Sequence, residues 1–96
     1  MSEKKMMEKI EGTIYLLYQN REAEGMTAVK EWLRVFQELL SDSEHIQDGE
    51  VKRFGILMLR ELLDAYRNRD IMEMADCLEE KSSLFIQAYF QEIKTK

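Results

Sequence analysis

The sequence contains no proline and only one cysteine and one histidine among its 96 residues. Without proline, no position forces a break inside a helix, so long uninterrupted helices can form. The single cysteine, Cys77, cannot close an internal disulfide, which excludes a disulfide-stabilised domain and favours the reducing cytoplasm. A zinc site or a carboxylate-bridged di-iron site needs more histidine and cysteine ligands than the chain holds. We therefore expect no metal and no other cofactor.

Long apolar runs and a basic charge balance are also missing. The longest apolar runs cover residues 14–18 and 56–59, far short of the roughly 20 residues that cross a bilayer. Nineteen acidic residues against fourteen basic ones give a net charge of −5. Proteins that bind nucleic acids or anionic membranes usually carry the opposite sign, so we expect neither partner. Residues 1–10 are charged and hold no continuous apolar run, so we expect no secretion signal there.

What the sequence does contain is helical periodicity, because its apolar residues recur every three or four positions. This pattern predicts four helices, at about residues 3–19, from 21 or 27 to 40, 49–66 and 70–93. Asn20, Asp48 and either Asn68 or Asp70 are the predicted helix N-caps, and the polar segment 41–49 is the predicted loop. A chain this short has room for one core. The sequence thus predicts a single all-α domain over residues 1–96, an antiparallel four-helix bundle built from two helical hairpins.

The two predicted hairpins share a faint repeat. The segment Tyr-Gln-Asn-Arg at residues 18–21 matches Tyr-Arg-Asn-Arg at residues 66–69, with an offset of 48. Two hairpins of similar build would explain this match. Helical periodicity alone also produces such matches, and both interpretations stay open.

Residues that carry chemistry in other proteins have unremarkable surroundings here. Cys77 falls at a core-facing or boundary position and is followed by Glu79 and Glu80, whose charge disfavours a thiolate, so we interpret it as a small hydrophobic residue. His45 lies in the predicted loop and is expected to be solvated. The four glycines are scattered and form no phosphate-binding loop. We predict no catalytic residues and no enzyme.

Three acidic residues, Glu73, Asp76 and Glu80, share one face of the last predicted helix. Carboxylate pairs can perform acid–base catalysis when burial separates their pKa values. A solvated charged face is the interpretation we favour, and any role of this face would be to dock a basic partner.

The sequence is rich in apolar residues toward its end and includes seven methionines, a residue common on surfaces that bind varied partners. This surplus either fills the core or forms a surface for a partner helix or a second copy. The residues predicted to bind a protein partner are Phe85, Ile86, Tyr89, Phe90 and Ile93.

Two resemblances to known families add to this interpretation. The run at residues 70–79, with Ala75, Asp76, Leu78 and Glu79, resembles a segment of small uncharacterised helical proteins from Firmicutes, and this resemblance implies a helical fold. Leu62 and Leu63, a short polar joint at residues 67–70 and an acidic–apolar helix through residues 78–81 are similar to flagellar export chaperones of the FliT type. That resemblance implies an apolar groove and no catalytic residues.

Three functional hypotheses follow. The first is a cytoplasmic, non-enzymatic interaction module, such as a chaperone or adaptor, that presents an apolar helical groove to a protein partner or to itself. The second is a purely structural homodimer that buries the helices at 49–66 and 70–93 between its subunits. The third, a remote alternative, is a bundle that binds a small ligand or catalyses a reaction in its core.

Overall fold

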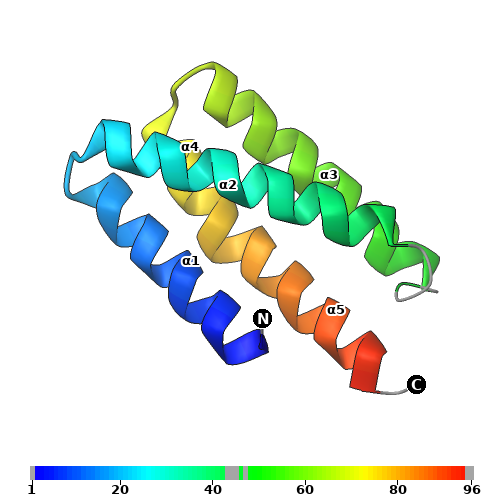
Figure 1. The fold of residues 1–96 in the computed structure, drawn as a ribbon. Coiled ribbons are helices and arrows are strands. Elements are labelled where there is room, and N and C mark those ends of the chain that lie inside the picture. The colour runs from blue at the N-terminus through cyan, green and yellow to red at the C-terminus, as the bar shows by residue number, and fades with distance from the viewer. Residues whose placement is uncertain (1, 43–45, 47, 95–96) are drawn as a thin grey trace.

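The computed structural model describes residues 2–42, 46 and 48–94, with side chains up to Glu92, and shows an all-α helical bundle. Its elements are α1 (Glu3–Tyr18), α2 (Glu22–Ser41), α3 (Gly49–Arg67), α4 (Ile71–Asp76), η1 (Cys77–Ser82) and α5 (Ser83–Lys94). The last three join end to end into one rod, so four rods run up and down as antiparallel neighbours (Figure 1). No strand occurs in the described ranges. The predicted fold class is confirmed.

The rods share one hydrophobic core. The rod of α4, η1 and α5 packs against both α1 and α3, and α2 packs against both of these as well. The largest fully buried side chains come from every rod: Ile10, Leu17, Val29, Phe36, Met58, Leu62, Met74, Leu78, Phe85 and Ile86. Burying each such side chain contributes about 1.5–3 kcal/mol. The predicted apolar stripes therefore face inward and hold the rods together.

The first joint differs from its prediction in one respect. Asn20 was the expected N-cap of the second helix, but it lies after the C-cap Gln19 with a φ of 59°. The N–H of Arg21 donates to the Leu16 carbonyl at 3.2 Å, which closes a Schellman motif. Asparagine tolerates this left-handed conformation better than most residues do. Asn20 therefore ends the first helix rather than capping the second.

The second joint has the same backbone form. Arg69 has a φ of 53° and follows the C-cap Asn68, and the N–H of Asp70 reaches back to the Ala65 carbonyl at 2.9 Å. The left-handed residues of the two joints, Asn20 and Arg69, are separated by one residue more than the offset of 48 in the sequence. The two joints therefore match in backbone form at positions that are shifted by one residue from the match in sequence.

The helix starts are capped unequally. The Asp48 carboxylate accepts the N–H of Glu50 at 2.8 Å, and the Asp70 carboxylate accepts that of Glu73 at 3.1 Å, as expected of N-caps. The N-cap of α2 is Arg21, whose side chain makes no capping hydrogen bond. Helix α2 begins at Glu22, one residue after the earlier of the two predicted starts, and Gly25 in its first turn is buried against Leu17 of α1.

The last rod was predicted as one regular helix, but residues 77–82 are π-helical. The N–H of Ser83 and its hydroxyl both point to the carbonyl of Leu78, five residues back; the hydroxyl donates at 3.0 Å. Such turns occur as single π-helical turns within α-helices. Ile86, one of the residues predicted to bind a partner, is completely buried in the segment that follows.

Candidate functional site

The five residues predicted to bind a partner do not form one surface. Phe85 and Ile86 have no exposed area, so neither can contact a partner while the bundle keeps this conformation. Tyr89 is only 6% exposed, whereas Phe90 is partly buried and lines a groove. The side chain of Ile93 lies outside the described residues. In this conformation Phe85 and Ile86 therefore belong to the core of the bundle and not to a binding surface.

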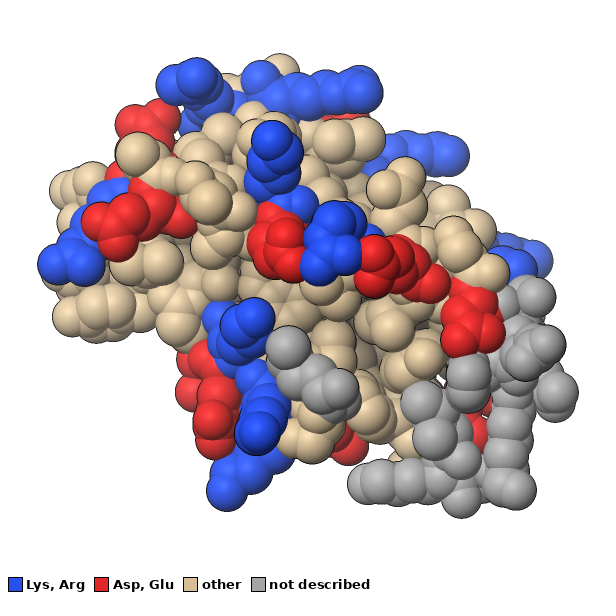
Figure 2. Space-filling view, viewed as in Figure 1, with Lys and Arg blue, Asp and Glu red and all other residues tan. Residues whose placement is uncertain are grey.

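The groove lined by Phe90 lies among α1, α2 and α5 and has a volume of about 660 Å³. Its walls are mostly apolar, and Gly12 leaves one side of it without a side chain. Its apolar lining consists of Met6, Leu16, Ala28, Trp32, Val35, Leu39, Tyr89 and Phe90. Figure 2 shows neutral side chains between two groups of charged ones, over the space between α1 and α2.

The polar groups in the wall of the groove satisfy one another. The indole Nε1 of Trp32, on α2, donates to the hydroxyl of Thr13, on α1, at 3.1 Å. The same hydroxyl donates to the Lys9 carbonyl at 2.9 Å. Thr13 and Trp32 are both buried, so this pair ties the helices together while leaving no unpaired polar atom there to attract a ligand.

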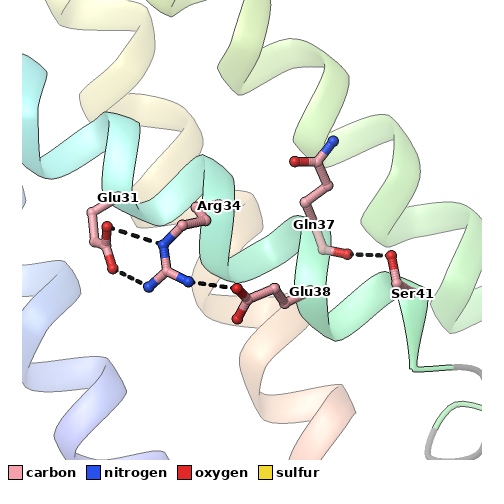
Figure 3. Close-up of polar contacts among 5 residues, drawn as sticks. All are labelled: Glu31, Arg34, Gln37, Glu38 and Ser41. Carbon is pink, nitrogen blue, oxygen red and sulfur yellow. Dashed lines mark hydrogen bonds and ion pairs between the residues drawn. The ribbon is translucent and has the colours of Figure 1, made fainter.

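Charged side chains lie in the groove lining and beside it on α2. On α2, Arg34 donates to the carboxylates of both Glu31 and Glu38 (Figure 3), next to the hydrogen bond from Ser41 to the Gln37 carbonyl. The hydrogen bond from Arg34 holds the pKa of Glu31 below its usual value, and the charge of Lys9, on α1, adds to this effect. The groove lining thus includes one positive side chain, Lys9 on α1, and one negative side chain, Glu31 on α2, which is already paired with Arg34.

Titratable groups near the groove are few. The phenol of Tyr89 has a raised pKa because it is buried, and the Asp42 carboxylate adds to the rise. A phenol with a raised pKa and a carboxylate paired with Arg34 do not form an acid–base pair for catalysis near neutral pH. The arrangement can bind apolar surface, and the groove itself presents no acid–base pair.

Cys77 lies in the core, as the sequence predicted. Its thiol is 3.6 Å from the Met58 carbonyl, and burial raises its pKa to about 11. A thiol that stays protonated at neutral pH is a poor nucleophile. Two residues of the predicted acidic face, Glu73 and Glu80, are exposed, in line with a solvated face. His45 lies outside the described residues.

Two further features are absent from the described part of the chain. No three His, Cys, Asp or Glu side chains there gather closely enough to hold a metal ion. None of the helices there has the length and apolar character required to span a membrane.

Comparisons with family models, curated proteins and solved structures find no match to this chain. The function is therefore inferred from the geometry of the groove and of the surface around it. Sequence reasoning placed the candidate surface on the last helix alone, whereas residues of α1 and α2 also line the groove. The available signal was the pair of small residues Gly12 and Thr13 on the first helix, although nothing in the sequence places them beside Trp32.

Proposed function

We propose that this protein is a non-enzymatic interaction module, of a chaperone or adaptor kind, that binds an apolar helical segment of a partner protein. The binding site is the groove among α1, α2 and α5. The observation that carries the proposal is a groove of about 660 Å³ with a mostly apolar lining that the core does not fill. Amphipathic helices bind such grooves through side chains that recur every three or four residues.

The polar groups of the wall favour a helix over a small polar ligand. Small-molecule sites usually combine an apolar lining with a few converging polar groups that orient the ligand. In this groove the polar atoms of Thr13 and Trp32 are committed to each other. Recognition then depends on shape and apolar contact, which a row of leucine or phenylalanine side chains on a helix provides.

The chain contains its own reporter for this interaction, because its only tryptophan lies in the groove wall. A titration with a synthetic amphipathic helical peptide, leucine on one face and neutral polar residues on the other, should change the emission of Trp32. Gly12→Leu should place an apolar side chain in the groove, since Gly12 lines it and a Cβ at this position would meet nothing within 4 Å. We expect this variant to lose about tenfold or more in affinity.

The matched control is Gln87→Leu, which adds the same side chain at an exposed position of α5 that does not line the groove. This variant should bind the peptide as the wild type does. Equal affinity of Gly12→Leu and the wild type would contradict the proposal. Sedimentation of both proteins at micromolar concentration tests the homodimer: a wild-type dimer that Gly12→Leu dissociates would assign the groove to a second copy.

A further inference from the structure

We propose that the outward face of α3 is a second docking surface, independent of the groove, for an acidic amphipathic helix of a partner protein. Arg53, Arg60 and Arg67 follow one another at intervals of seven residues, and all three are exposed. Seven residues advance a helix by about 10.5 Å and return nearly to the same side. The three guanidinium groups therefore form a line along α3, opposite the face that is buried in the core.

Two apolar side chains lie within this line. Ile56 and Leu57 are 44% and 50% exposed, and both fall between Arg53 and Arg60 in the sequence. Each lies three or four residues from both arginines, so all four share one helix face. We call the set of Arg53, Ile56, Leu57, Arg60 and Arg67 the α3 strip. Exposed apolar residues flanked by charges are a common composition of protein-binding surfaces.

The arginines of the α3 strip differ in their ion pairing from other positively charged side chains of the molecule. Arg34 and Lys81 form ion pairs with nearby carboxylates. None of the three strip arginines forms an ion pair with any described residue. Figure 2 shows lysine and arginine side chains gathered along the upper edge of the molecule, where α3 lies in Figure 1.

Charge complementarity indicates which kind of partner the α3 strip would bind. Asp64 lies on the same face, so the strip and Asp64 together carry three positive charges and one negative, in a protein whose net charge is −5. Carboxylates spaced by seven residues on a partner helix would meet the arginines in register, and guanidinium groups bind carboxylates in a two-pronged geometry. The net negative charge of the whole protein and the small apolar area disfavour a lipid surface.

A second copy of this chain fits the strip less well. Helix α2 does carry Glu24, Glu31 and Glu38 at the same seven-residue interval. Those carboxylates are already paired, Glu24 with Arg21 and the other two with Arg34. Docking α2 of another copy would have to break these pairs, whereas a separate acidic helix would bring unpaired carboxylates.

The test uses two synthetic helical peptides of three heptads each. One carries glutamate at every seventh position with leucine three and four residues later, and the other carries lysine in place of glutamate. Binding to the full chain is measured by fluorescence anisotropy of the labelled peptide. We expect the acidic peptide to bind about tenfold or more tightly than the basic one, with an affinity that falls as salt is added.

Charge-reversal variants test whether the α3 strip is the surface that binds the acidic peptide. Arg60→Glu should weaken the acidic peptide about tenfold, while the matched charge reversal Lys5→Glu, at an exposed site on α1, should change it less than about twofold. Reversal of all three strip arginines should switch the preference to the basic peptide, and circular dichroism confirms that each variant is folded. Gly12→Leu, which blocks the groove, should leave this binding intact, so the two proposals can fail separately.

Three outcomes would overturn the inference. The first is equal affinity for the two peptides. The second is an equal loss in Arg60→Glu and Lys5→Glu, since both then report only the net charge of the protein. The third is adsorption to phosphatidylserine vesicles that Arg60→Glu abolishes, which would make the strip a lipid-binding surface.

Discussion

Two helical glycines show how differently the two sides of this bundle are built. A Cβ at Gly55, on α3, would lie 2.5 Å from Cε1 of Phe85 and 2.7 Å from Cδ2 of Leu40, so this side is closed by direct approach of the rods. A Cβ at Gly12, on α1, would meet nothing within 4 Å. The same residue type closes one side and leaves the other open, as the groove.

The closed side contributes to the stability of the fold, whereas the open side provides the surface proposed for binding. On the closed side, Phe85 packs edge-on against Phe36 with ring centroids 6.0 Å apart, in a fully buried environment. On the open side, the wall is held by the hydrogen bond of Trp32 to Thr13, and apolar surface is left for a partner. A bundle this small buries little surface, so it needs a fully packed side to remain folded. The packed side allows the other side to expose a groove.

The largest effect is expected at the closed side. Gly55→Ala forces a methyl group into the ring of Phe85, and overpacking of this kind costs about 1–3 kcal/mol. Because Phe85 is fully buried, we expect a loss in the upper part of this range despite the better helix propensity of alanine. Urea unfolding followed by circular dichroism measures it. Unchanged stability would mean that the two sides are packed alike.

A smaller loss is expected at the wall of the open side. Thr13→Val keeps the shape of the side chain but leaves the buried N–H of Trp32 without its acceptor, which costs about 1–3 kcal/mol. The control is Thr27→Val on α2, where the lost hydroxyl is exposed and bonds only to the Ala23 carbonyl of its own helix. If the two variants unfold at the same urea concentration, the interhelical hydrogen bond does not hold the wall.

The smallest effect on stability is expected at Gly12, in the lining of the groove, and it is a gain in stability and not a loss. Gly12→Ala should stabilise the protein by about 0.5–1 kcal/mol, because alanine restricts the unfolded chain and meets no neighbour here. The same urea titration measures it and pairs it with Gly55→Ala. A loss of stability at Gly12 would show that the open side closes in solution.

Much of the fold could be predicted from the sequence because helical periodicity is a local signal. The positions of the four helices and the caps Asp48 and Asp70 follow from residues within one or two turns of each other. The prediction was wrong at the first joint. Asparagine can cap one helix or end another, and the hydrogen bond from the N–H of Arg21 to the Leu16 carbonyl shows that Asn20 has the second role.

The candidate site was less predictable. Phe85, Ile86 and Phe90 are equally apolar in the sequence, and only the packing of the last rod against its neighbours decides that the first two enter the core while Phe90 lines the groove. The groove joins Gly12 and Thr13 to Trp32 and Phe90 across three elements, and no spacing in the sequence encodes that proximity. The line of arginines on α3 is the exception, since its seven-residue interval is a property of the sequence itself.

The sequence by itself determined that this protein is helical and that its rods present an apolar side to each other, because both depend on short-range periodicity and on the absence of proline. Only the tertiary structure decided which apolar residues remain accessible. Accessibility depends on how closely two rods approach, which the sequence does not show: atoms of other helices lie against Gly55, whereas none lies near Gly12.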